Sequence, residues 1–407
     1  MNSTKQSKQA ILLYVSTLLG TLLGVLSSIV NTRFLSPEDY GDLRYVQNII
    51  NFISIILLLG YFQSGSRLLA LSHDEKKSKK IRGGLVIILA ITCLVLLISI
   101  SLLYLFHANS PELAYLFIVS LPVCFYPLFN NYINTTAQGD NHIIRISINR
   151  LLPMLLYVPL GYVIYSYTGA TSAKMILLQW GIYTLIGLAV IVSTKPNFHS
   201  LRPIFHQLNA ENKSYGIQLY YGSIVMVATN YIAGVTLGIF NEDNVNVGFY
   251  TLALTITSPL ALLPSIIGTT YFKQFATENR IPTKVMKVTF LMSAVSCLLF
   301  ILLINPIVNL LYSKHYSMVG VYASWLAVGY CLHGLGDMIN RFLGSHGQGK
   351  TIRNASFFCG IFKIFGFIIF VYLWDITGAL LTCVVSSTIY FLSIAFYYSK
   401  FIKEYEI

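Results

Sequence analysis

The sequence has 407 residues, of which 55% are hydrophobic and only 10% are charged, and its net charge at pH 7 is +12. About one quarter of the residues of a soluble domain are charged, and even a large soluble domain leaves much of its surface in water, so this composition excludes a soluble globular protein. The hydrophobic residues form continuous runs of roughly 20 residues rather than an alternating pattern, which predicts membrane-spanning helices and not a β-barrel.

The pattern of hydropathy predicts about twelve transmembrane helices, each long enough to cross a hydrocarbon core of about 30 Å. The first run follows Lys5 and Lys8 as in a signal peptide, but it is too long and no small-residue cleavage site follows it, so we expect it to remain in the protein. The predicted fold class is therefore an all-α polytopic membrane protein. The spans are expected at residues 10–32, 44–66, 84–106, 113–133, 146–168, 173–193, 215–239, 246–270, 285–309, 318–340, 354–373 and 376–399.

Lysine and arginine residues collect in alternate connections between these spans. One set of connections, which includes both ends of the chain, holds 22 of the 27 basic residues. Because connections rich in Lys and Arg stay on the cytoplasmic side, both termini are predicted to be cytoplasmic. The positive charge is then a signal of topology, with anionic lipids as a further contact, and it does not indicate a nucleic-acid partner.

The connection at residues 195–214 is the longest one that contains proline, histidine and several charges. It divides the chain into an N-terminal lobe of six helices (1–194), a cytoplasmic linker (195–214) and a C-terminal lobe of six helices (215–407). The first span carries Gly20-x-x-x-Gly24 and the seventh carries Gly234-x-x-x-Gly238, each followed by a short acidic loop. Glycines four residues apart let helix backbones approach closely, and the similar openings predict two parallel repeats.

Two patterns that elsewhere indicate chemistry are rejected here. The six cysteines lie inside apolar runs and form no CxxC pair, which excludes a zinc ribbon or a redox motif. Gly344–Thr351 matches the Walker A pattern letter by letter, but that motif needs a preceding strand, and a transmembrane helix is predicted there. We predict no metal, no cofactor and no catalytic group.

Lys363 lies about ten residues into the eleventh predicted span, roughly 15 Å deep at 1.5 Å per residue. A lysine that faces lipid at the middle of the membrane costs at least about 2.5–3.5 kcal/mol. We therefore expect Lys363 to face a hydrated cavity, with a buried contact to an oxygen such as that of Asp337 as the alternative. Asp337 and Arg341 are four residues apart on one face of the tenth span, and both an interfacial ion pair and a gating pair remain open.

Each of the other polar residues within or beside the spans has two possible interpretations. Arg145 and Arg150 open the fifth span, either as ordinary cytoplasmic charges or as the lining of an inner entrance. Arg33 and Arg44 lie on the outer side against the charge bias, either paired with nearby carboxylates (Glu38, Asp39, Asp42) or, for Arg33, projecting into a central cavity. Amides within the spans serve either to join helices or to hydrogen-bond sugar hydroxyls; they are Gln47, Asn48, Asn51, Asn130, Asn131, Asn134 and Asn230.

Four short motifs, in this order, resemble the Wzx-type polysaccharide flippases of the MOP exporter superfamily, and the resemblance covers essentially the whole chain. They are Arg33-Phe-Leu-Ser-Pro-Glu-Asp-Tyr-Gly41, Val247-Gly-Phe-Tyr-Thr-Leu-Ala253, Leu311-Tyr-Ser-Lys-His-Tyr316 and Gly347-Gln-Gly-Lys350. The resemblance implies a two-lobed protein of the bacterial inner membrane that flips undecaprenyl-diphosphate-linked oligosaccharide, such as an O-antigen repeat unit of lipopolysaccharide, from the cytoplasmic to the periplasmic leaflet. It also implies a cationic central cavity, for which Arg33, Arg150 and Lys363 are the candidates. Implied partners are the lipid-linked substrate, membrane lipids and other polysaccharide assembly proteins.

Two other functions fit twelve helices. A MATE-like antiporter of cationic small molecules would need carboxylates within its helices, and only Asp337 approaches that position. A polysaccharide polymerase or ligase would need an active site on a large outer loop, and the predicted outer loops are short. We therefore expect a transporter and not an enzyme.

Overall fold

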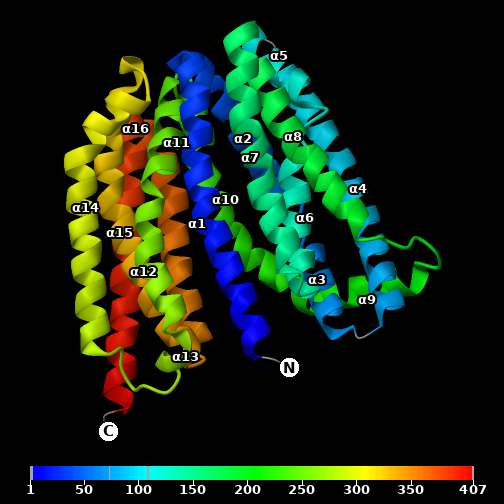
Figure 1. Ribbon diagram of the computed structural model, residues 1–407, viewed down its shortest axis with the longest axis vertical. Coiled ribbons are helices and arrows are strands. Elements are labelled where there is room, and N and C mark those ends of the chain that lie inside the picture. Colours follow the sequence, from blue (N-terminus) through cyan, green and yellow to red (C-terminus); the bar gives the residue numbers. More distant parts are fainter. Residues whose placement is uncertain (1–2, 73, 108–109, 406–407) are drawn as a thin grey trace. The chain divides into compact units, whose positions relative to one another are not determined.

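The computed structural model describes residues 3–72, 74–107 and 110–405 (Figure 1). In these residues every regular element is a helix. Contacts between residues divide the chain into two compact units, Met1–Tyr231 and Ile232–Ile407.

The N-terminal unit contains the first six spans. Four of its helices are long and apolar enough to cross a membrane alone, namely α1, α4, α7 and α8. The second span is the pair α2 and α3, bent by 58°, and the fourth is divided between α5 and α6. The elements are α1 (Ser3–Phe34), α2 (Pro37–Ile56), α3 (Tyr61–Leu71), α4 (Glu75–Phe106), α5 (Pro111–Ser120), α6 (Tyr126–Gly139), α7 (Ile143–Thr168), α8 (Ser172–Ser193), α9 (Arg202–Glu211), the π-helix η1 (Asn212–Gly216) and the first part of α10 (Ile217–Phe240).

The bend between α2 and α3 has a local cause in the sequence. Gly60 takes a left-handed conformation with φ of 80°, which glycine adopts without steric cost, and α2 ends just before it. Carbonyl groups freed at the bend receive hydrogen bonds from the other end of this unit: Asn212 Nδ2 donates to Leu59 O at 3.1 Å and the Tyr220 hydroxyl donates to Ile56 O at 2.6 Å. The π-helix and the start of α10 are thereby fixed to the broken second span.

The predicted linker at residues 195–214 contains the short helix α9, which packs on α3 and α4. Its apolar side chains Ile204 and Leu208 are buried, and both lie 3.2 Å from the position that a Cβ on Gly84 of α4 would occupy. The linker is therefore part of the folded N-terminal unit.

The C-terminal unit contains the last five spans and the second part of the seventh, α10. α11 and α12 together form one apolar span from Val245 to Thr270. Helix α16 contains a non-helical residue, Asp375, so its two arms, 349–374 and 376–405, are separate spans. The elements are the rest of α10, α11 (Val245–Thr257), α12 (Pro259–Thr270), α13 (Phe272–Phe275), α14 (Thr283–Leu311), the 3-10 helix η2 (Lys314–Tyr316), α15 (Met318–Ser345) and α16 (Gly349–Tyr405).

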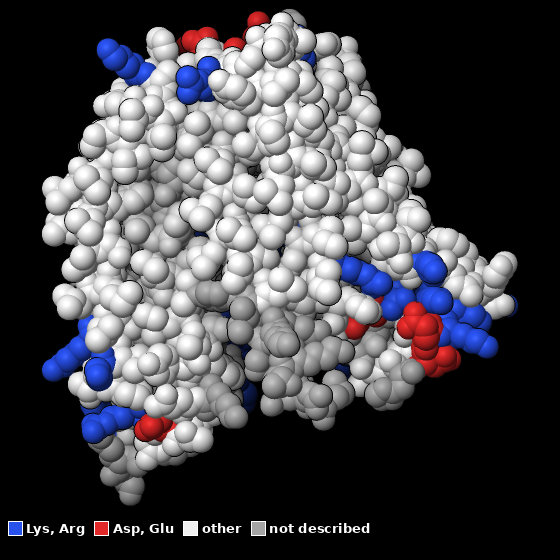
Figure 2. All heavy atoms as spheres, viewed as in Figure 1, with Lys and Arg blue, Asp and Glu red and all other residues white. Residues whose placement is uncertain are grey.

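These helices confirm the predicted fold class of about twelve spans in two lobes. In each unit the visible charged side chains gather toward the ends of the helices and leave a wide band almost without charge (Figure 2). Large apolar side chains are exposed along this band, for example Leu302 and Leu94, as expected of helices that face lipid. The contact-based boundary falls inside α10, and the predicted lobe limits 1–194, 195–214 and 215–407 remain a prediction.

Candidate functional site

Helix α1 presents a stripe of polar and small residues to α7 and α8. The stripe runs through Ser16, Gly20, Gly24, Ser27 and Asn31, a spacing that places all five on one helix face. Their partners belong to the neighbouring spans. Side chains of α7 bond the two ends of the stripe, where the Ser147 hydroxyl lies 3.2 Å from that of Ser16 and the Tyr157 hydroxyl donates to Asn31 Oδ1; Gln179 of α8 donates to Ser27 Oγ at 3.1 Å.

The side chain of Arg150 packs against the stripe at Gly20, where glycine has no side chain to occupy the space. Its guanidinium donates a hydrogen bond to the Thr17 hydroxyl of α1. A Cβ on Gly20 would lie 3.0 Å from both Cγ and Cδ of Arg150, whereas a Cβ on Gly24 would have no neighbour within 4 Å. The first Gly-x-x-x-Gly pair therefore makes room for an arginine side chain, and not for the close approach of two backbones that its spacing predicts.

Arg44 is the cation at the centre of the polar residues in this unit. Its Nε donates to the Tyr40 hydroxyl at 2.9 Å and its Nη1 donates to Gln47 Oε1 at 3.0 Å, and its guanidinium lies over the Tyr40 ring, 4.9 Å from the centroid. Gln47 continues the network through Gln179, 3.4 Å away. These hydrogen bonds connect Tyr40, Arg44, Gln47, Gln179 and Ser27. Asn31, one turn beyond Ser27 on α1, forms a separate pair with Tyr157, which lies within electrostatic range of Arg44. We call all seven residues the N-terminal cluster.

The N-terminal cluster has an excess of donors and of positive charge. In the described part of the chain Arg44 makes no ion pair, so no ion pair supports the alternative in which a neighbouring carboxylate neutralises it. The Nδ2 group of Asn31 is fully buried and donates to no described acceptor. A buried donor without a partner costs about 1–3 kcal/mol, and charged donors bond most strongly to anionic oxygens. The cluster is chemically suited to an anion with several acceptor oxygens.

Arg33 does not belong to this cluster. It lies in the last turn of α1, is exposed, and forms no ion pair within the residues that the structure describes. Its position on the helix continues the exposed apolar face of α1 (Val15, Leu19, Leu22 and Leu26), which points away from α7 and α8. Its predicted role in a cavity stays a prediction.

Lys363 belongs to a second group of polar residues, in the C-terminal unit. The Tyr390 hydroxyl donates to Asp337 Oδ1 at 3.0 Å and accepts a hydrogen bond from Asn340 Nδ2 at 2.7 Å. The rings of Tyr390 and His333 are stacked with centroids 4.6 Å apart, and Lys363 and Asp337 both lie within electrostatic range of His333. We call these five residues the C-terminal cluster.

The predicted partners of Asp337 do not pair with it. No ion pair joins Asp337 to Lys363 or to Arg341 in the described residues. Arg341 is exposed, and its Cγ lies 3.1 Å from the position of a Cβ on Gly268 of α12. Asp337 is turned toward α16 instead, and a gating role for these two residues remains a prediction without an ion pair to support it.

Arg145 lies in a third network, at the basic end of the N-terminal unit. Asp140, in the turn between α6 and α7, accepts from Arg82 Nε at 2.9 Å and from Arg145 Nη1 at 3.4 Å. Arg82 also donates to Thr194 O, at the end of α8. This network joins three spans, and it includes the one basic residue of the α4 region that is buried.

The sequence analysis named Arg44, Gln47 and Asp337 but missed other members of the two clusters. Among those missed, His333 and Asn340 follow an i, i+4, i+7 pattern with Asp337 on α15, and that spacing indicates a polar helix face. Gln179 and Tyr390 stand alone in their spans, and no local pattern marks them.

The fold is that of the MOP superfamily of membrane proteins. An inward-facing multidrug resistance MATE transporter superimposes with a TM-score of 0.66 at 18% identity, covering 94% of this chain and 96% of that one. The lipid II flippase MurJ in an inward closed conformation has a TM-score of 0.74 at 16% identity, covering 95% and 87%. A MOP transporter from Pyrococcus furiosus, described as having a binding pocket of reversed polarity, gives 0.59 at 15%, covering 97% and 96%. At these identities the similarity shows the fold alone.

The family is shown by the sequence itself. Residues 7–272 match the model of a family described as polysaccharide biosynthesis protein, and the chain belongs to that family. The predicted resemblance is thus confirmed at two levels, since the family is one of polysaccharide biosynthesis and the fold is that of MOP transporters and flippases. A comparison with curated protein sequences finds no match.

Proposed function

We propose that this protein moves undecaprenyl-diphosphate-linked oligosaccharide repeat units from the cytoplasmic to the periplasmic leaflet of a bacterial inner membrane, by alternating access of its two lobes. The observation that carries the proposal is the N-terminal cluster, in which Arg44 has only neutral hydrogen-bond partners. A diphosphate is a strong acceptor for a guanidinium. The amide and hydroxyl groups around Arg44 are of the kind that hydrogen-bond sugars.

The proposed direction follows from the charge of the molecule. The ends of the helices that carry most of the lysines and arginines would face the cytoplasm, which also places both termini there. Moving about two negative charges outward through an inside-negative potential of about 100 mV would release roughly 4.6 kcal/mol. The membrane potential can therefore drive this transport without a coupling ion.

A cation antiporter is the main alternative, and the observation in its favour is Asp337. This carboxylate lies within the C-terminal unit and has no basic ion-pair partner in the described residues. Lys363 nevertheless lies within electrostatic range of His333, as Asp337 does, and its ammonium group would repel a cationic substrate. The N-terminal cluster contains no carboxylate, so it favours an anionic substrate over a cationic one.

The test is leaflet transfer by purified protein in liposomes that contain fluorescent undecaprenyl-diphosphate oligosaccharide. A membrane-impermeant quencher reports the fraction of lipid in the outer leaflet, and wild-type protein should make the whole pool accessible faster than protein-free liposomes. Arg44→Gln keeps two neighbouring hydrogen bonds possible but removes the charge, and it should slow transfer at least tenfold. Arg353→Gln, at an exposed arginine of the C-terminal unit, is the matched control and should behave as wild type.

Two results would contradict the proposal. The first is transfer of a cationic dye across the same liposomes without transfer of the glycolipid, which would favour the antiporter. The second is an Arg44→Gln variant that is folded and transfers the glycolipid at the wild-type rate.

A further inference from the structure

Six basic side chains gather where the segment between α8 and α9 lies along the first turns of α4. Figure 2 shows lysine and arginine atoms concentrated at this end of the N-terminal unit, near α4 and α9. The two segments are in direct contact: Asn197 N donates to Lys79 O at 2.8 Å, and a Cβ on Gly83 would lie 2.0 Å from Asn197 O. The six residues, which we call the α4 basic patch, are Lys76, Lys77, Lys79, Lys80, Lys195 and Arg202.

The positive charge of the α4 basic patch exceeds the negative charge of the carboxylates beside it (Figure 2). Within the described ranges none of its six side chains forms an ion pair. The two acidic residues at the start of α4 have other partners, since Glu75 pairs with Arg82 at 3.3 Å and Asp74 accepts from the backbone N–H of Lys76 at 2.9 Å. Because a backbone N–H does not remove the charge of Asp74, that carboxylate offsets one of the six positive charges, and the patch keeps a net positive charge of up to five.

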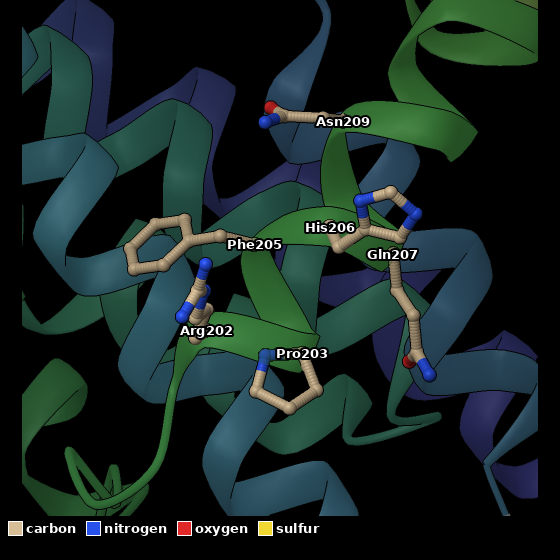
Figure 3. A pocket seen from close by; sticks show the side chains of 6 residues that line it. All are labelled: Arg202, Pro203, Phe205, His206, Gln207 and Asn209. Carbon is tan, nitrogen blue, oxygen red and sulfur yellow. The ribbon is translucent and has the colours of Figure 1, made fainter.

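Aromatic side chains accompany these charges. Phe198 is 53% exposed, and Phe205 of α9 is half-buried. Figure 3 shows Arg202 and Phe205 projecting to one side of α9, with His206 and Gln207 on the other side, around an open hollow of about 560 Å³. Exposed aromatic rings beside cations are typical of segments that lie at the membrane interface.

The lysines of the α4 basic patch are expected to lie just outside the layer of lipid head groups, within reach of it. The continuous apolar run of α4 begins at Leu85, five residues after Lys80 and nine after Lys76. At 1.5 Å per residue the lysines are about 8–13 Å from the start of that run, whereas the head-group layer extends roughly 5–8 Å beyond the hydrocarbon. Flexible lysine side chains cover the difference, and the Debye length of about 8 Å leaves their attraction to lipid phosphates effective.

We propose that the α4 basic patch binds the phosphate head groups of anionic phospholipids in the leaflet at this end of the bundle. Four to eight Lys and Arg residues directly outside a transmembrane helix form such sites. The general excess of basic residues on one side of a membrane protein does not require the basic segments to touch one another. In this protein the segment between α8 and α9 is packed against Gly83 and hydrogen-bonded to Lys79 of α4, so two distant parts of the sequence form one patch. The inference does not depend on the transported substrate or on which leaflet is cytoplasmic.

The experiment measures binding of fluorescent phosphatidylglycerol to the full-length protein in a neutral detergent. Each lysine near an anionic surface contributes a factor of about five in affinity, so the quadruple variant Lys76→Gln, Lys77→Gln, Lys79→Gln, Lys80→Gln should bind at least a hundredfold more weakly. The matched control changes four exposed basic residues of the C-terminal unit to glutamine and should bind as wild type. They are Lys284, Lys287, Lys350 and Arg353.

Three further measurements decide the specificity. Unlabelled phosphatidylglycerol should displace the probe, and phosphatidylcholine and inorganic phosphate should not. Equal losses in the two quadruple variants, or displacement by phosphatidylcholine or by inorganic phosphate at the lipid concentration, would overturn the proposal. If the quadruple variant does not fold, the double variant Lys76→Gln, Lys77→Gln in the exposed first turn should still lose at least tenfold in affinity.

Discussion

Asp140→Asn is expected to destabilise the N-terminal unit strongly, because Asp140 is the shared partner of two arginines. The side chains of Arg82 and Asp140 are only 5% and 6% exposed, so neither charge is well hydrated. Removing one partner of a buried ion pair lowers the free energy of unfolding by about 3–5 kcal/mol, because the other charge stays buried without its partner. Arg82 keeps Glu75 and the carbonyl oxygen of Thr194, each at 3.3 Å, so we expect the lower end, about 3 kcal/mol. At about 2–4 °C per kcal/mol for a unit of this size, that corresponds to a fall in Tm of about 6–12 °C.

The assay is thermal unfolding of the purified protein in detergent, with Glu75→Gln as the control. Glu75 binds the same guanidinium as Asp140, but its side chain is 66% exposed, and an exposed ion pair contributes at most about 1 kcal/mol. The control should therefore melt within about 4 °C of wild type. Equal losses of Tm in the two variants, or an Asp140→Asn protein as stable as wild type, would refute the argument from burial.

Three further changes test other parts of the structure. Gly20→Val places a side chain in the space that Arg150 occupies and should reduce glycolipid transfer in liposomes several-fold, because Arg150 must move. Gly24→Val places its side chain in open space and should leave transfer unchanged. Gly216→Ala places a methyl group 2.5 Å from a main-chain oxygen of the α2–α3 bend and should lower the free energy of unfolding by about 1–3 kcal/mol, measured by thermal unfolding. Lys363→Ala should slow transfer without loss of folded protein, measured by the same liposome assay with size-exclusion chromatography as the check on folding.

The number of spans could be predicted from the sequence because hydropathy depends on residues within one helix. The broken spans could not. Gly60 is an ordinary residue in a hydropathy plot, and its left-handed conformation is fixed by contacts with η1 and the start of α10, far away in the sequence. The turn at Asp375 was predicted correctly, because the eleventh span was expected to end at residue 373 and the twelfth to begin at residue 376.

The candidate site was predictable only in part, for a physical reason. A single lysine in an apolar run, such as Lys363, is conspicuous because its transfer to lipid is so unfavourable. Arg44 is close to the expected end of its span, where charges are common, and so it was interpreted as a partner of neighbouring acids. Only the side-chain geometry shows that it bonds to Tyr40 and Gln47. Both partners lie on the same helix as Arg44, at i−4 and i+3, as do the neighbouring acids, so sequence spacing alone does not decide which of them the guanidinium binds.

The two clusters differ in charge balance, and this changes which residue should bind an anion most strongly. In the C-terminal cluster Lys363 and Asp337 both act on His333, so a diphosphate that approaches Lys363 also meets a carboxylate. In the N-terminal cluster Arg44 has only hydroxyl and amide partners, so the same diphosphate meets no negative charge. Because the attraction between an anion and a cation is offset by any carboxylate at similar distance, replacing Arg44 should weaken substrate binding more than replacing Lys363. Lys363 is the more conspicuous residue in the sequence, but Arg44 is the stronger candidate for the anion-binding group.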